Sequence, residues 1–141
     1  MNQGFQNKTV LITGASSGIG KALTIAMLQA GARVAICARN SKNLQEVKEE
    51  LMNKNLLTVQ ADVSIESDCK QFIDAAVAAF GRIDILINNA GGSRSFKELH
   101  VGEEAWQEAL TLNFHRPRQI ADALIDQMIA RRWGRIINIT G

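Results

Sequence analysis

Residues 10–20, with the sequence VLITGASSGIG, constrain the fold more than any other part of the chain. An apolar strand runs into a turn that contains Gly14, Gly18 and Gly20, and a helical pattern follows at once. Gly14 permits a tight turn, Gly18 lets an anionic group approach the backbone, and Gly20 lets the helix pack close to its strand. Free N–H groups and the positive end of the helix then face the anion. The segment therefore predicts a site for the phosphates of a dinucleotide.

Apolar runs typical of strands alternate with helical patterns along the rest of the chain, and this alternation indicates a parallel sheet. We expect strands at residues 9–12, 33–38, 56–60, 83–87 and 135–139. Helices are expected at residues 21–30, 42–52 with Ser41 as N-cap, 67–80, and across the region 103–132. With right-handed crossovers, the first three strands build outward in one direction and the fourth returns to the other side of the first. The prediction is one α/β domain over residues 1–141, a three-layer Rossmann fold whose doubly wound parallel sheet has strand order 3-2-1-4-5.

Composition fits a globular domain and argues against several other kinds of function. The 141 residues are 46% hydrophobic, which is enough for one core. A formal net charge of +2, without a basic stripe interleaved with aromatic residues, argues against a nucleic-acid partner. Cys37 and Cys69 lack the spacing of metal ligands or of a disulfide framework, so we expect no metal and a reducing, cytoplasmic location. No apolar run is long enough to cross a bilayer, so no membrane partner is expected.

Several motifs together resemble the short-chain dehydrogenases/reductases of the classical type. They are the glycine turn after Thr13, Asp62 after the third strand, the sequence NNAG at residues 88–91, and Asn113. The resemblance covers essentially the whole chain, but only the N-terminal half or somewhat more of a typical family member. It implies an oxidoreductase that binds a nicotinamide dinucleotide and transfers hydride to or from a small-molecule carbonyl or secondary alcohol.

The carboxyl ends of the first and fourth strands are predicted to meet at the point where the strand order reverses. The glycine turn and residues 88–91 both follow these ends, so two distant loops form one site. Short amides at residues 88 and 89 can tie neighbouring strand ends, while Ala90 and Gly91 leave room for a ribose and a nicotinamide. The cofactor-binding residues implied by motif and resemblance are Gly14, Ser16, Ser17, Gly18, Ile19, Gly20, Arg39, Asp62, Val63, Asn89, Ala90 and Gly91.

The choice of cofactor is expected to depend on the end of the second strand, which reaches the adenosine ribose. An acidic side chain there favours NAD, but the chain has Ala38 and then Arg39, whose guanidinium can hold a 2′-phosphate. We therefore predict NADP, with NAD as the alternative. Arg39 has a second interpretation as a solvated loop residue. Ser17 occupies a position where many NADP-dependent relatives carry a basic residue, so the preference depends on Arg39.

Asp62 also has two interpretations. In the family, this position accepts a hydrogen bond from the adenine amino group, and the backbone of Val63 lies beside it. Asp62 or Ser64 can instead cap the helix that follows.

Asn113 aligns with the family's catalytic asparagine, whose main-chain carbonyl holds a water that links the catalytic lysine to solvent. Pro117, four residues on, has no N–H, so in a continuous helix the carbonyl of Asn113 lacks its i+4 donor. Alternatively, the helix starts near Phe114 and Pro117 lies in its first turn, where proline is tolerated.

The sequence contains no tyrosine, so the family's active-site Tyr-xxx-Lys is absent. Carbonyl reduction requires a proton donor beside the hydride acceptor. We therefore expect a piece of a longer protein, truncated after the fifth strand and inactive by itself. A bare fifth strand would expose apolar surface, which predicts a homo-oligomer or aggregation. A non-catalytic dinucleotide-binding or sensing module is the alternative function.

Overall fold

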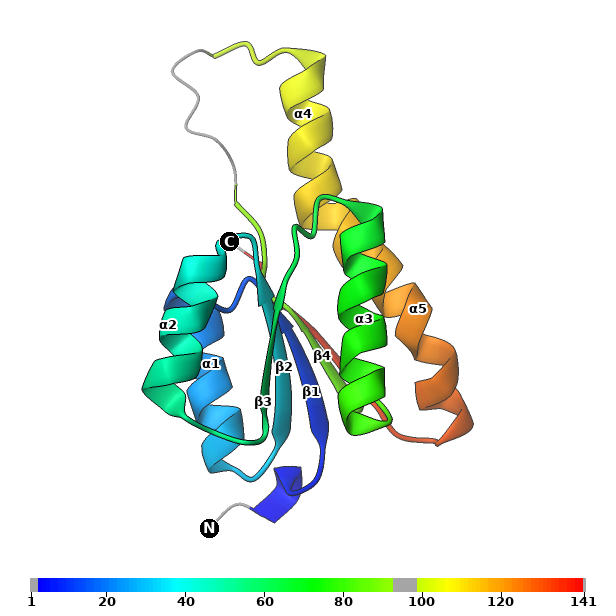
Figure 1. Cartoon of the computed structure of the whole chain (residues 1–141). Helices are drawn as coiled ribbons and strands as arrows, with labels where there is room; N and C mark the ends of the chain where they lie inside the picture. The colour runs from blue at the N-terminus through cyan, green and yellow to red at the C-terminus, as the bar shows by residue number, and fades with distance from the viewer. Residues whose placement is uncertain (1–2, 93–98, 141) are drawn as a thin grey trace.

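Five parallel strands form one sheet at the centre of the molecule (Figure 1). The computed structural model describes residues 3–92 and 99–140. The strand order is β3-β2-β1-β4-β5, and every neighbouring pair is parallel, which confirms the predicted doubly wound topology. The strands are β1 (Thr9–Thr13), β2 (Arg33–Ala38), β3 (Leu56–Gln60), β4 (Ile85–Asn88) and β5 (Arg135–Asn138).

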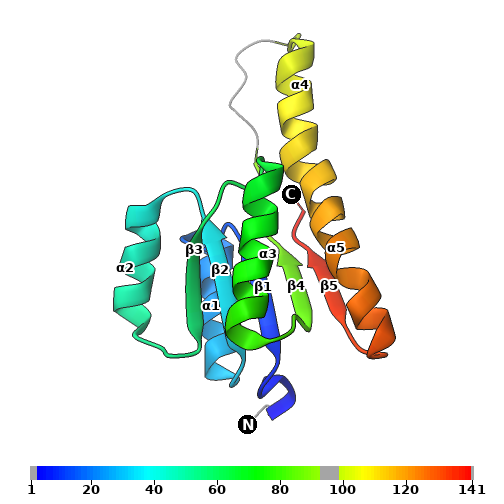
Figure 2. The same ribbon diagram turned by 45° about the vertical axis from the view of Figure 1, so that its right-hand side comes forward.

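Helices cover both faces of the sheet, with α1 and α2 on one side and α3 and α5 on the other (Figures 1 and 2). Side chains alternate along β1: Leu11 packs in the cluster that includes α3 and α5, and Val10 and Ile12 pack in the cluster with α1 and α2. This is the three-layer arrangement that the sequence predicts. Besides the short 3-10 helix Gln3–Phe5, the helices are α1 (Gly18–Gln29), α2 (Ser41–Leu51), α3 (Glu66–Phe80), α4 (Glu103–Leu110) and α5 (Arg116–Ala130).

The N-cap of α2 differs from the prediction. Ser41 is the first helical residue, and the cap is Asn40, whose backbone is extended at φ −90° and ψ 108°. The Oδ1 atom of Asn40 accepts a hydrogen bond of 3.0 Å from the N–H of Asn43. The amide side chain of Asn40 therefore satisfies a donor of the first turn, one residue before the predicted position.

The helical region predicted over residues 103–132 is one run with a change of register inside it. Between α4 and α5 lies a π-helical turn, Thr111–His115, and the N–H of Arg116 donates to the carbonyl of Thr111. Pro117 lies in the first turn of α5. The helical run therefore continues through Phe114 and does not begin there. Pro117 nevertheless lies in the first turn of α5, as the alternative interpretation required. Above the sheet, α4 extends past the carboxyl ends of the strands (Figure 1).

Candidate functional site

The glycine turn between β1 and α1 has the backbone geometry that its sequence predicts. Gly14 has φ +63° and Gly18 has φ +55°, in the left-handed region that favours glycine. A Cβ atom on Gly14 would lie 2.8 Å from the Cα of Ala90, and one on Gly20 would lie 2.5 Å from Nδ2 of Asn89. A Cβ on Gly18 would meet nothing within 4 Å. Two glycines thus allow close packing against the loop after β4, and the third leaves its backbone open to a ligand.

The first turn of α1 is available to an anion. Its N-cap, Ser17, is extended and makes no side-chain capping hydrogen bond, and the first turn contains no acidic residue. Ser17, Gly18 and Ile19 are all exposed. The N–H groups at this helix end have no side-chain cap, and the helix dipole favours negative charge there.

Thr13 joins the two loops that the sequence predicts to meet. Its Oγ1 atom accepts hydrogen bonds from the N–H groups of Asn89 (3.1 Å) and Ala90 (2.9 Å). In return, Nδ2 of Asn89 donates to the carbonyls of Thr13 (3.1 Å) and Gly14 (3.0 Å). Sequence analysis assigned no role to this threonine. Its position, as the last residue of a buried strand and directly before the glycine turn, is the signal that was available.

Asn88 ties strand ends together, as its position suggested. Its side chain is buried, and Nδ2 donates to the carbonyl of Pro117 (3.2 Å) and to Oδ1 of Asn138 (3.0 Å). This amide therefore links β4 to both β5 and α5, and it faces away from the groove described next.

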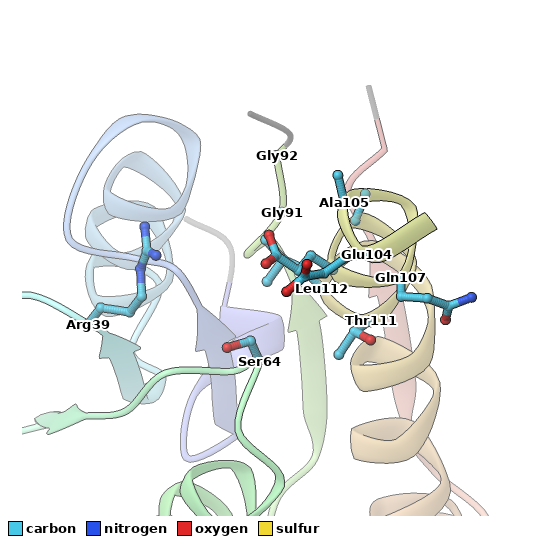
Figure 3. A pocket seen from close by; sticks show the side chains of 11 residues that line it. Arg39, Ser64, Gly91, Gly92, Glu104, Ala105, Gln107, Thr111 and Leu112 are labelled. Atoms are coloured by element: carbon cyan, nitrogen blue, oxygen red, sulfur yellow. The ribbon is translucent and has the colours of Figure 1, made fainter. Parts of the chain in front are cut away.

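A groove of about 510 Å³ runs along the carboxyl ends of β1, β2, β3 and β4. All the predicted cofactor-binding residues except Gly18 and Gly20 line it. A second cavity of about 710 Å³ lies beside it, between Arg39, Ser64 and α4 (Figure 3). The two cavities share Arg39, Ser64, Gly91 and Leu112. The predicted residues therefore converge on one continuous hollow.

Arg39 follows β2 and lines both cavities. Its side chain is exposed, and within residues 3–92 and 99–140 its guanidinium makes no hydrogen bond or ion pair. Figure 3 shows the Arg39 side chain across the cavity from α4, with Ser64 between them. The geometry suits either an anionic ligand or solvent at this guanidinium.

Asp62 forms a tight turn rather than a helix cap. Its Oδ1 atom accepts hydrogen bonds from the N–H (2.9 Å) and the Oγ (2.7 Å) of Ser64. The N-cap of α3 is Ile65, which makes no side-chain capping bond. The capping interpretation of Asp62 and Ser64 is therefore wrong, because the carboxylate is used two residues on, before the helix begins. The first turn of α3 instead supplies Asp68, whose Oδ2 accepts a hydrogen bond from the N–H of Asp62 (2.8 Å).

The side chain of Asn113 forms hydrogen bonds to the backbone of Gly92 and Ala109, which the sequence did not predict. Its Oδ1 accepts from the N–H of Gly92 (2.9 Å), and its Nδ2 donates to the carbonyls of Gly92 (2.7 Å) and Ala109 (2.8 Å). A Cβ on Gly91 would lie 2.8 Å from this Oδ1, so glycine is needed for the close approach. Because Pro117 has no N–H, the main-chain carbonyl of Asn113 has no i+4 donor.

Of the two cysteines, Cys37 lines the groove and Cys69 does not. Both are free and buried, and burial raises the pKa of the Cys37 thiol to about 12. Among the described residues, no group of three or more His, Cys, Asp or Glu side chains is placed to hold a metal ion. In the same part of the chain, no helix has the length and apolar character needed to cross a membrane.

The fold and the groove define an α/β protein of the Rossmann type, and comparison with known proteins gives the family. The family model described as short chain dehydrogenase matches residues 8–141. The chain therefore belongs to the short-chain dehydrogenase family, as its motifs predicted.

Individual relatives agree with this assignment. The chain is 33% identical over 134 residues to an uncharacterized oxidoreductase of Staphylococcus epidermidis, covering 95% of this chain and 58% of the relative. It is 33% identical over 137 residues to the 3-oxoacyl-[acyl-carrier-protein] reductase FabG of the same species, covering 95% and 56%. A crystal structure of a short-chain dehydrogenase/reductase of unknown function from Caenorhabditis elegans, solved with cofactor, matches with a TM-score of 0.90 at 32% identity, covering 97% and 54%. The chain thus spans a little over half the length of each of these three relatives.

Proposed function

We propose that this chain is the NADP-binding part of a short-chain oxidoreductase. The proposal is carried by the groove, where an uncapped glycine turn and the Arg39 guanidinium, which has no partner among residues 3–92 and 99–140, follow adjacent strands. A dinucleotide has phosphate charge at its centre, and NADP has a further phosphate on the adenosine ribose. The groove offers backbone N–H groups of the glycine turn for the central phosphates and the Arg39 guanidinium for the ribose phosphate.

Each part of the dinucleotide has an assigned partner in this proposal. Residues 14–20 bind the pyrophosphate through backbone N–H groups and the α1 dipole. Arg39 holds the 2′-phosphate, and NAD is the alternative cofactor if this contact contributes nothing. Asp62 and Val63 contact the adenine. Residues 89–91 flank the ribose and nicotinamide, where small side chains leave space.

The bound dinucleotide supplies or accepts hydride, and the residues of this chain bind and orient it. We propose that the intact protein acts on a small-molecule carbonyl or secondary alcohol, with the main-chain carbonyl of Asn113 holding a water of its proton relay. The 141 residues contain no tyrosine, so they do not include the family's proton donor. By this proposal they bind the cofactor without turning over substrate.

Calorimetric titration of the 141-residue chain with NADPH and NADH tests the proposal. We expect NADPH to bind more tightly, and Arg39→Ala to weaken NADPH about tenfold through loss of charged hydrogen bonds, with NADH little changed. Arg118→Ala is the matched control, because Arg118 is exposed and pairs with Asp122 on α5. Equal loss for both nucleotides, or none, would remove the NADP assignment. Failure of both nucleotides to bind would remove the proposal itself.

A second candidate function is a non-catalytic module that binds or senses the dinucleotide, because the groove and the glycine turn account for binding alone. The intact mass of the protein in its native source separates the two functions. A mass well above that of the 141 residues supports the oxidoreductase, and a downstream Tyr-xxx-Lys should then be found. A mass equal to that of the 141 residues supports the binding module.

A further inference from the structure

The helical run from α4 to α5 contacts two of the loops at the carboxyl ends of the strands, the one after β3 and the one after β4. At the π turn, Asn113 holds the backbone of Gly92, which follows β4. Three residues later, Nε of Arg116 donates to the main-chain carbonyl of Ser64, which follows β3, at 3.1 Å. Ser64 lines both cavities. Two side chains of one helical segment thus reach loops that are distant from each other in the sequence.

Arg116 is half-buried, and its guanidinium has a second partner besides Ser64. Arg116 also bonds Oε1 of Gln119, one turn further along α5, which orients the guanidinium. Both of these acceptors are uncharged, and among the described residues the guanidinium of Arg116 forms no ion pair with a carboxylate. A hydrogen bond from a charged donor to a carbonyl is stronger than a neutral one. Arg116 is therefore suited to fix the position of one backbone carbonyl.

That carbonyl belongs to the turn assigned to the adenine. The N–H and the hydroxyl of Ser64 both donate to Oδ1 of Asp62, and Asp62, Val63 and Ser64 line the groove. Holding Ser64 from outside the groove therefore restrains the Asp62 carboxylate inside it. Restraint of this kind reduces the ordering cost of binding.

The π turn contributes to the position of Arg116. The N–H of Arg116 closes the turn on the carbonyl of Thr111. Each residue of an α-helix rotates about 100° around the axis, so one extra residue in a turn redirects every later side chain by a similar angle. The change of register thus helps to determine the direction of the Arg116 side chain, which reaches the loop after β3.

We propose that Arg116 is a positioning residue for the adenine end of the dinucleotide. It acts through Ser64 and Asp62 and does not touch the ligand. The inference rests on the proposed function, because it assigns the restrained turn to the adenine.

Titration with ADP tests the inference, because ADP carries the adenine end that NAD and NADP share. We expect Arg116→Ala to weaken ADP about tenfold and Arg116→Lys to recover most of the affinity, because an ammonium can still donate to the Ser64 carbonyl. Arg118→Ala, two residues away and paired with Asp122, should leave ADP binding unchanged. In amide NMR spectra, Arg116→Ala should shift the signals of residues 62–64 and leave those of residues 14–20 in place.

Three outcomes decide the matter. An Arg116→Ala variant that binds ADP as tightly as the unmodified chain overturns the inference alone. An unmodified chain that binds neither ADP nor NADPH overturns the proposed function, and the inference with it. If Arg116→Ala does not fold, Gln119→Ala retains the guanidinium but removes its orienting partner, and it should weaken ADP in the same direction; unchanged ADP binding by Gln119→Ala then overturns the inference.

Discussion

The side chains around the groove mostly bond to backbone groups of another loop. Thr13 accepts from the loop after β4, Asn89 donates back to the glycine turn, and Asn113 holds Gly92 through both atoms of its amide. Each bond fixes a main-chain position without using the groove surface itself. The shape of the groove is therefore held before a ligand is bound, which is the condition for precise orientation.

Thr13→Val is the sharpest test of this role, because the two side chains have nearly the same shape. Valine removes the acceptor and leaves the N–H groups of Asn89 and Ala90 without their partner. We expect the free energy of unfolding in urea to fall by about 1–3 kcal/mol, and NADPH binding to weaken. Thr13→Ser retains the hydroxyl and should lose less. Identical unfolding curves for Thr13→Val and the unmodified chain would contradict the assignment.

The buried thiol of Cys37 should make the stability of the fold depend on pH in the alkaline range. Burial raises its pKa from 9.0 to about 12, because the thiolate is disfavoured in the core. The unfolded chain releases this proton near pH 9 and the folded chain only near pH 12. The stabilisation is therefore complete below pH 9 and is lost as the pH rises from 9 towards 12.

Two measurements check this prediction. Thiol labelling at pH 8 should be slow for the native chain and fast for both cysteines in urea. Cys37→Ala should make the melting temperature less sensitive to pH above 9 than it is in the unmodified chain. Labelling of native Cys37 at the rate of an exposed thiol would show that the core is open.

At the scale of elements, Asp84 connects strands at their amino ends, which lie at the opposite end of the sheet from the groove. Its Oδ2 accepts from the N–H of Thr9 (2.9 Å), and its carbonyl accepts from the N–H of Arg135 (3.1 Å). Arg82 and Arg131 lie 3.1 and 3.8 Å from its Oδ1, and the carboxylate is buried. The carboxylate thus connects the amino end of β1 to Arg82 and to Arg131 at the end of α5, and the main-chain carbonyl of Asp84 connects to the amino end of β5.

Asp84→Ala should destabilise the chain more than any surface change. It leaves a buried N–H and two guanidinium groups without their acceptor, and we expect a loss of about 3 kcal/mol. Asp84→Asn retains an acceptor for Thr9 and should lose less. Chemical denaturation of both variants measures the difference, and equal losses would mean that the charge, rather than the hydrogen bond to β1, dominates.

Element positions followed closely from local patterns. The strands β2 and β3 have the predicted bounds, and the predicted helix over residues 103–132 is one helical run. The π turn inside that run was not predicted, although Pro117 marked its neighbourhood. Propensity and periodicity describe the helix as a whole, but a change of register depends on what its side chains contact, here Gly92 and Ser64.

At the scale of the whole molecule, the last strand and the last helix leave apolar residues exposed at one edge of the sheet. Ile125 and Ile129 on α5 and Ile137 on β5 are 40%, 66% and 42% exposed, and a cavity of about 340 Å³ lies between α5 and β5. On the sheet, β5 is an edge strand that pairs only with β4 among the described strands. Exposed apolar residues beside an edge strand favour association.

The 141-residue chain should therefore self-associate at micromolar concentration. Light scattering coupled to size exclusion should give a mass above that of one chain, and Ile129→Glu should increase the fraction of monomer. Ile65→Glu is the control, because Ile65 is similarly exposed at 47% but lies before α3. A monomer at every concentration tested would contradict the prediction.

By itself, the sequence determined the class of fold, the order of the strands and the two loops that form the groove. These features depend on local properties: apolar periodicity, backbone freedom at glycine and the handedness of crossovers. Only the tertiary structure decided the partners of Thr13, Asn113 and Arg116 and the use of Asp62 in a turn. The physical reason is separation along the chain. Thr13 lies 76 residues from Asn89, Asn113 lies 21 from Gly92, and Arg116 lies 52 from Ser64, so these hydrogen bonds exist only once the sheet has brought the strand ends together.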